Sequence, residues 1–135
     1  MAEKILFKFI SDTRGAVLAE FAVAVLTLII ATFGVIDMGL FLWTDVTLNR
    51  ATHAAARCRT LDQTNCGSDG AAQTYAVTQS WGAGMLTAAN FTVGTCTSGG
   101  LPGVQVVGSY SYSFITPGVG PTANLSHTAC YPRQY

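Results

Sequence analysis

Glu20 carries a carboxyl group in surroundings where a charge is costly. It is the only charged residue in an apolar run that extends from Ala16 to Ile36. A charge within a membrane-spanning helix costs on the order of 2.5 to 3.5 kcal/mol at the centre of the span and less near an end, so Glu20 is a candidate functional residue. A glutamate resting among lipid headgroups is the simpler alternative. Gly15 lies five positions earlier, where a short charged segment ends.

Thiol groups are the second candidates for chemistry, and all four cysteines follow the apolar run. In an oxidising compartment we expect them to form disulfides, for which three pairings are possible. We favour a bond between Cys58 and Cys66, which closes a loop after the N-terminal helix, and one between Cys96 and Cys130, which joins the last strand to the first. No C-x-x-C pair or histidine spacing supports a zinc site. We therefore expect neither a metal nor another cofactor.

The remaining polar residues do not form a recognisable catalytic motif. Neither His53 nor His127 has a neighbouring acid or thiol in the sequence that would make it a general base. Beyond Asp45 the only carboxylates are Asp62 and Asp69, both near one predicted loop, so an acid–base pair is not expected. We predict that the protein is not an enzyme and has no catalytic residues.

Charge is distributed unevenly along the 135 residues, although the formal net charge is zero. No Lys, Arg, Asp or Glu occurs from Gly70 through Pro132. A surface of this kind lacks the basic stripe that binds nucleic acid, so the expected partners are proteins and membrane lipid, with no nucleic acid among them. After the apolar segment, the chain has room for one domain of modest size.

The apolar run predicts a membrane-spanning helix. From Phe21 to Ile36 about sixteen uncharged residues would form roughly 24 Å of helix, which is short of a hydrocarbon core near 30 Å. Apolar side chains continue beyond Asp37 to Trp43, a residue type that suits the membrane interface. A spanning helix from about Ala16 to Trp43 is therefore long enough.

Basic residues predict the orientation of this helix. Lys4, Lys8 and Arg14 lie on its N-terminal side, and the positive-inside rule keeps that side cytoplasmic and the C-terminal domain outside. All four cysteines then lie on the exported side. Asp37 either faces water at the outer interface or contacts a helix of a neighbouring subunit.

Beyond the membrane the helix is expected to continue to about residue 60. Leu48, Ala51, Ala55 and Cys58 recur at helical spacing and form a stripe of mostly small residues. Packing within the chain is the favoured role of this stripe. Three arginines flank it and are expected to be solvated or paired with Asp45 and Asp62: Arg50, Arg57 and Arg59.

The C-terminal part predicts a second short helix and three strands. Residues 61–70 predict a loop, and residues 71–81 predict a helix ended by Gly82 and Gly84. Residues 104–114 alternate between apolar and polar side chains, which is typical of a half-buried strand, with a bulge or bend at Gly108. Two further strands are predicted at residues 91–95 and 125–131, with connecting turns at residues 98–100 and 116–121. A three-stranded antiparallel sheet beside a long helix makes an α+β fold.

The segment from Arg14 to Phe21, RGAVLAEF, resembles the processing site of type IV pilin-like precursors. In those proteins a membrane-embedded prepilin peptidase cuts after a glycine and leaves a glutamate at the fifth position of the mature chain. The resemblance implies cleavage between Gly15 and Ala16, and a role for Glu20 and Phe21 in filament assembly. The new ammonium group of Ala16 would lie one helical turn from Glu20, near the positive end of the helix dipole.

A longer stretch, from Arg14 to Asp62, is similar to the TadE-like family of minor pseudopilins of the tight-adherence (Tad or Flp) pilus. The similarity rests on Glu20-Phe21-Ala22, on FGVIDMG at residues 33–39 and on NRATHAAAR at residues 49–57. Many relatives carry a proline in the middle of the apolar run, where this chain has Thr27, so the helix loses no backbone hydrogen bond there. Weaker similarities lie in residues 104–114, in Pro117 and Pro121, and in residues 125–130.

This resemblance implies a type IV pilin-like protein with a leader peptide over residues 1–15, an N-terminal helix over residues 16–60 and a small exported domain over residues 61–135. Its implied location is the bacterial inner membrane, with one span, a cytoplasmic N-terminus and a periplasmic C-terminal domain, or a pilus after incorporation. Its implied function is assembly or priming of a Tad-type pilus for adhesion and surface attachment. Its implied partners are the prepilin peptidase, other pilin or pseudopilin subunits and the inner-membrane pilus assembly machinery.

Two alternatives stay open. A bitopic periplasmic binding or scaffold protein of a secretion system would explain the span but would give Gly15 and Glu20 no role. A secreted enzyme released by signal peptidase would also have basic residues before an apolar stretch, with Ala22-Val23-Ala24 as an imitation of a small-residue cleavage site. That site, however, falls inside the apolar run rather than after it.

Overall fold

The computed structural model describes residues 13–81, 84–115 and 122–133. Its longest element, α2, runs from Thr13 to Leu61 over 49 residues. No proline interrupts this segment, and Leu, Ala and other good helix formers fill much of it. The helix continues without a break through Thr27. The predicted long N-terminal helix is therefore confirmed, with ends slightly outside the predicted ones.

The chain divides into two compact units between Met38 and Gly39. In the first unit, the described residues belong to α2 alone. The second unit contains the rest of α2, the shorter helices and the strands. In this unit helices pack against a sheet, and α2 contributes residues to the core from Phe41 onward.

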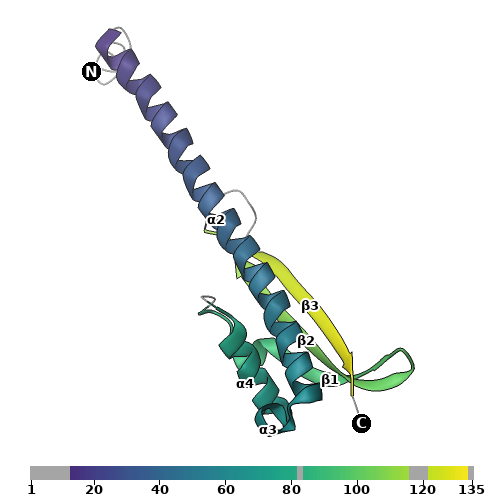
Figure 1. Cartoon of the computed structure of the whole chain (residues 1–135). Helices are drawn as coiled ribbons and strands as arrows, with labels where there is room; N and C mark the ends of the chain where they lie inside the picture. Colours follow the sequence, from purple (N-terminus) through teal and green to yellow (C-terminus); the bar gives the residue numbers. More distant parts are fainter. Residues whose placement is uncertain (1–12, 82–83, 116–121, 134–135) are drawn as a thin grey trace. The chain divides into compact units, whose positions relative to one another are not determined.

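Two short helices follow α2 in the second unit (Figure 1). They are α3, at Gln63–Cys66, and α4, at Asp69–Gln79. The hydroxyl oxygen of Ser68 accepts a hydrogen bond from the backbone N–H of Ala71, which caps the start of α4. The second helix was therefore predicted correctly in kind, but it begins two residues earlier than expected and ends before the glycines expected to stop it. Of those glycines, Gly82 lies outside the described residues.

The connection between α2 and α4 is more ordered than the predicted loop over residues 61–70. The carboxylate of Asp62 accepts hydrogen bonds from the backbone N–H groups of Thr64 and Asn65, which caps α3. A disulfide joins Cys58 to Cys66, whose Cα atoms are 5.8 Å apart. The prediction of a plain loop is wrong because this cap and this bond together hold a helical turn.

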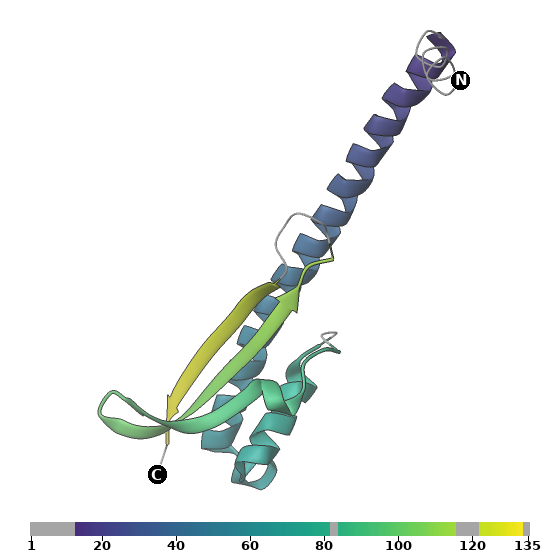
Figure 2. The same ribbon diagram turned by 180° about the vertical axis from the view of Figure 1, so that it is seen from behind.

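Three antiparallel strands form one sheet, which Figure 2 shows from the other side. They are β1 (Phe91–Ser98), β2 (Leu101–Ser113) and β3 (Thr122–Pro132), with β2 in the centre, and the short helix η1 (Ala88–Asn90) precedes them. Gly99 and Gly100, with φ angles of 60° and 81°, form the β1–β2 turn in a backbone region that favours glycine. The predicted three-stranded antiparallel sheet is confirmed. The turn predicted over residues 116–121 lies outside the described residues.

Gly108 lies at the centre of the sheet and pairs one to one with a residue on each side, Phe91 of β1 and His127 of β3. The bulge predicted at Gly108 is therefore not formed. A side chain at this position would overlap the hydroxyl of Thr52 and approach Leu48 of α2. The glycine allows α2 to pack directly against the middle of the sheet.

The core of the second unit lies between the sheet and the part of α2 after Gly39. Small alanines on α2 let the helix approach the sheet closely, which confirms that the predicted stripe packs within the chain. Deeply buried residues of this core include Leu48, Ala51, Ala55 and Ala56 of α2, Phe91 of β1, Val104 and Val106 of β2, and Ala129 of β3.

A second disulfide joins Cys96 of β1 to Cys130 of β3 across the central strand. Their Cα atoms are 6.2 Å apart. In a flat sheet, two strands separated by a third would lie about 9.6 Å apart, so the sheet must curl at this end. Both disulfides follow the pairing favoured from the sequence.

Candidate functional site

The first unit presents an apolar helical surface with very few polar groups. From Val17 to Ile36 the large apolar side chains of α2 are at least 47% exposed, except that of Val25, which is partly buried. Among the described residues, α2 is the one helix that is long and apolar enough to cross a membrane, with a mean hydropathy of 2.3 in its most apolar window. Such a helix near the N-terminus is consistent with a single-pass membrane protein.

Gly15, Ala16, Glu20 and Phe21 all lie in the first turns of α2. Positions 16 and 20 are four residues apart in a helix, so they share one face, about 6 Å apart along the axis. Glu20 is exposed, and the side chain of Phe21 is 67% exposed. The structure therefore brings the four predicted residues into one short segment, with the carboxylate one turn after residue 16.

The hydroxyl groups of Thr27 and Thr32 find partners within α2 itself. Thr27 Oγ1 donates to the carbonyl of Val23 at 2.9 Å, and Thr32 Oγ1 donates to the carbonyl of Leu28 at 2.8 Å. Such bonds let a polar side chain reside in an apolar environment. Among the residues that the structure describes, no such hydrogen bond to Glu20 is seen.

Asp37 ends the apolar run, and its side chain is only 4% exposed. Trp43, six residues further along α2, is 57% exposed, as expected for a residue at a membrane interface.

In the second unit, Asp45 of α2 and His127 of β3 form a contact that was not predicted. The Nε2 atom of His127 lies 2.7 Å from Oδ1 of Asp45, and both side chains are partly exposed. The two residues are 82 positions apart, so no spacing rule could pair them. This contact joins α2 to β3 across the core of the second unit.

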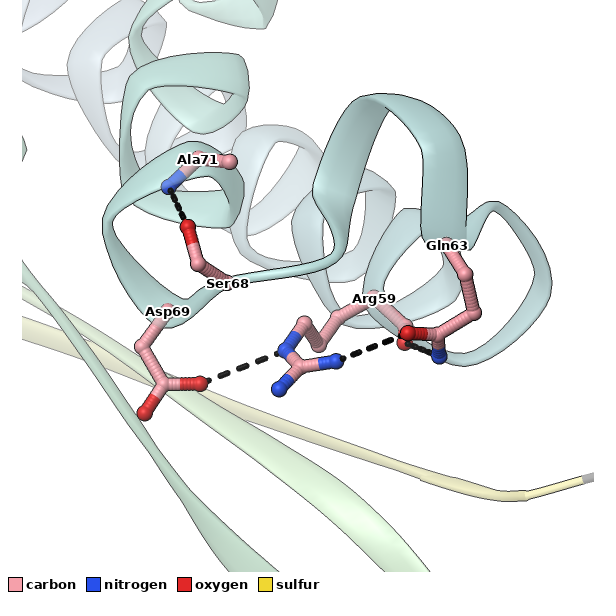
Figure 3. Close-up of polar contacts among 5 residues, drawn as sticks. All are labelled: Arg59, Gln63, Ser68, Asp69 and Ala71. Atoms are coloured by element: carbon pink, nitrogen blue, oxygen red, sulfur yellow. Dashed lines mark hydrogen bonds and ion pairs between the residues drawn. The ribbon is translucent and has the colours of Figure 1, made fainter.

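Arg59 near the end of α2 binds Asp69 at the start of α4 (Figure 3). Its Nε atom lies 3.2 Å from Oδ1 of Asp69, and its Nη1 donates to the side chain of Gln63 at 3.5 Å. An acid at a helix N-terminus and a base at a helix C-terminus both complement the helix dipoles. The predicted pairing of the arginines with Asp45 and Asp62 is therefore wrong for Arg59.

The other two predicted partners have different roles. Asp45 binds His127, and Asp62 caps α3. Arg50 lies over the ring of Trp81, with its Cζ atom 5.2 Å from the ring centre, which is a cation–π geometry.

The carboxyl group of Asp62 is held in its charged form by hydrogen bonds. The side-chain amide of Asn65 donates to its Oδ2 at 2.6 Å, and the backbone N–H groups of Asn65 and Thr64 donate to its Oδ1 at 3.0 Å each. These bonds favour the charged carboxylate, so the pKa of Asp62 lies below its usual value. The shift follows from capping and indicates no catalytic role.

The reactive side chains of the described residues are spread over several contacts. No group of three or more His, Cys, Asp or Glu residues lies together within residues 13–81, 84–115 and 122–133. All four cysteines are used in disulfides. His53 contacts the hydroxyl of Tyr131, with 3.3 Å between Nδ1 and the oxygen, which again joins α2 to β3.

The N-terminal part of the chain is similar to a known protein family. A family model described as TadE-like protein matches residues 15–57. The match includes all three segments on which the resemblance rests, but it ends before the disulfides and the sheet, so the weaker similarities at residues 104–114 and 125–130 lie outside it. Searches of curated proteins and of solved structures found no significant match.

The matched segment corresponds to most of α2, from Gly15 to Arg57. Pro117 and Pro121, which also carried part of the resemblance, are outside the described residues. The architecture, a long apolar helix followed by a short helix and a three-stranded antiparallel sheet, is a pilin-like α+β arrangement. Over residues 15–57, the chain is similar to the TadE-like protein family.

Proposed function

We propose that this protein is a minor pseudopilin that is processed after Gly15 by a prepilin peptidase and acts in the assembly or priming of a Tad-type pilus. The observation that carries the proposal is the TadE-like match over residues 15–57. It coincides with an exposed apolar helix that has one carboxylate near its start. This similarity suggests an association with the Tad pilus, and the residues of α2 suggest how the subunit would be processed and assembled.

Processing after Gly15 would cut the chain in the first turn of α2, which begins at Thr13. The first four N–H groups of a helix have no acceptor within the helix, so this turn is held less firmly than later ones. A peptidase could therefore extend the backbone around Gly15 while the rest of α2 stays helical. The products would be a leader over residues 1–15 and a mature chain that begins with Ala16.

Cleavage would create a partner for Glu20. The new ammonium group of Ala16 would lie one turn before the carboxylate, and the helix N-terminus adds a positive partial charge worth about 0.3 to 1 kcal/mol. An unpaired carboxylate in the bilayer is penalised by on the order of 2.5 to 3.5 kcal/mol at its centre. Pairing with the amine of the same subunit or of a neighbour would offset this penalty. Pairing between subunits would also set the register of an incoming subunit.

The same interpretation assigns a location to each part of the chain. Residues 16 to about 43 would span the inner membrane, the helix would continue to residue 60, and residues 61–135 would form the exported domain. Lys4, Lys8 and Arg14 support a cytoplasmic N-terminus by the positive-inside rule. The two disulfides lie after the span, and they suit an oxidising compartment such as the periplasm. Other pilin or pseudopilin subunits, membrane lipid and the inner-membrane assembly machinery would be its partners.

Replacement of Glu20 by glutamine tests the assembly role. Glu20→Gln keeps the size of the side chain and removes its charge, so the subunit should still insert into the membrane while piliation falls strongly. Thr27→Val is a matched control in the same helix, because the Thr27 hydroxyl bonds only within α2 among the described contacts. Normal piliation in the Glu20→Gln strain, at normal levels of the subunit, would contradict the proposed role of the carboxylate.

A further inference from the structure

An apolar groove of about 190 Å³ opens in the second unit. Three stretches that are distant in sequence contribute to it: α2 just after Gly39, the segment before η1, and the end of β2. Its lining includes Leu40, Trp43, Met85, Tyr110 and Ile115.

The rim of this groove exposes large apolar side chains. Ile115 is 79% exposed, Met85 68%, Trp43 57% and Leu40 49%. Each Å² of apolar surface removed from water stabilises by about 25 cal/mol, so a rim of this kind favours contact with an apolar phase. Neighbouring exposed apolar side chains on a folded surface mark a site of interaction.

The polar groups of the groove suit a membrane interface rather than a charged ligand. None of its lining residues carries a formal charge. The hydroxyl of Tyr110 donates to Sδ of Met85 at 3.1 Å, within the groove itself. Trp and Tyr, which combine an apolar ring with one polar group, are enriched at the level of lipid headgroups.

The position of the groove along α2 also favours lipid as its occupant. Trp43 lies seven residues beyond Ile36, where the apolar run ends. Along a helix this is a rise of about 10 Å. The interfacial layer of a bilayer adds roughly 5 to 8 Å beyond the hydrocarbon core on each side. Leu40 and Trp43 would therefore lie at or just outside the headgroup layer, and Met85 and Ile115 lie in the same groove.

We infer that this groove rests on the outer surface of the bilayer, with Met85 and Ile115 inserted among the lipid headgroups. The inference rests on the proposed membrane span of α2. Contact at three separate stretches would hold the exported domain against the membrane before the subunit enters a filament. To leave the membrane, the subunit would then have to break this lipid contact and also withdraw its apolar helix from the bilayer.

Tryptophan quenching by brominated lipid tests the inference on the full chain. A background variant, Trp43→Phe with Trp81→Phe, removes both native tryptophans. Single tryptophans are then introduced by Met85→Trp, Ile115→Trp, Ile30→Trp or Leu101→Trp. The protein is reconstituted in phosphatidylethanolamine–phosphatidylglycerol vesicles that carry bromine either near the headgroup or near the end of the acyl chain. Leu101 is the matched control, because it is also exposed and apolar but lies at the β1–β2 turn.

We expect the tryptophans at positions 85 and 115 to lose much of their emission with bromine near the headgroup and little with deep bromine. Position 30 should be quenched most by deep bromine, and position 101 by neither lipid. Quenching at position 30 without quenching at positions 85 and 115 overturns the lipid contact and leaves the span intact. Equal quenching at positions 85, 115 and 101 overturns it as non-specific adsorption. No quenching at position 30 overturns both the span and the contact.

Discussion

Thr52 of α2 and Gly108 of β2 pack so closely that no methyl group fits between them. A Cβ atom at position 108 would overlap the hydroxyl of Thr52, and it would lie 3.1 Å from Cδ1 of Leu48 and 3.3 Å from Cε1 of Phe91. Thr52 is fully buried and its hydroxyl donates to the carbonyl of Leu48 at 2.7 Å, so it cannot easily move aside. This contact determines how closely α2 approaches the sheet.

Gly108→Ala should therefore destabilise the exported domain by about 1 to 3 kcal/mol, the usual effect of overpacking a core. Urea unfolding of the full chain in detergent micelles, followed by near-ultraviolet circular dichroism, measures the loss. Gly94→Ala is the control, because a Cβ atom on that strand glycine meets no atom within 4 Å. Equal stability of the two variants would show that α2 and β2 are further apart than described.

The contact between Asp45 and His127 should contribute a measurable coupling free energy. Both side chains are partly exposed, 36% for Asp45 and 26% for His127, so we expect about 0.5 to 1 kcal/mol rather than the value of a buried pair. A double-mutant cycle with Asp45→Ala and His127→Ala, followed by urea unfolding, measures this coupling free energy. Strictly additive effects of the two substitutions would contradict the contact.

The two disulfides should differ in how much they stabilise the domain. In the chain-entropy model the stabilisation grows with the length of the closed loop. The bonded cysteines are 8 positions apart in Cys58–Cys66 and 34 positions apart in Cys96–Cys130. That model predicts about 2.5 kcal/mol for the first bond and about 4 kcal/mol for the second. The Cys96→Ser/Cys130→Ser variant should therefore unfold at lower urea than the Cys58→Ser/Cys66→Ser variant, and the reverse order would refute the assignment.

Lowering the pH should destabilise α3, because it protonates the carboxylate of Asp62 that caps this helix. The hydrogen bonds from Asn65 and Thr64 depress the pKa of this carboxyl in the folded chain. Its contribution to stability is therefore fully present above the unfolded-state pKa near 4, and it is lost as the pH falls through the lower folded-state value. The amide NMR signals of Thr64 and Asn65 should titrate with a midpoint below pH 4. Asp62→Asn keeps a capping oxygen and should abolish this titration. A midpoint at or above the usual value in the unmodified chain would argue against the cap.

Much of the fold could be predicted because its signals are local. The apolar run and its continuation beyond Asp37 predicted one long helix, and alternation in residues 104–114 predicted the central strand. The disulfide pairing followed from the expected proximity of strand and helix ends. Glycine was harder to interpret, since Gly108 could mark either a bulge or a close approach, and only the packed helix distinguishes the two.

The missed features depend on contacts between distant residues. Asp45 and His127 meet only because the sheet places β3 beside α2, and Arg59 finds Asp69 only because α3 reverses the chain. Gly15, Ala16, Glu20 and Phe21 were chosen by their spacing, and the structure places all four in one helix, while their roles stay predictions. The apolar groove could not, because its residues come together from three separate stretches.

The account depends most directly on cleavage between Gly15 and Ala16. Mass spectrometry of the intact chain and of its N-terminal peptide, from cells with and without the prepilin peptidase, measures this cut. The account predicts a chain that begins at Ala16 when the peptidase is present, an uncut chain when it is absent, and an uncut chain for Gly15→Leu in either case. A mature chain that begins at any other residue in cells with the peptidase would contradict it.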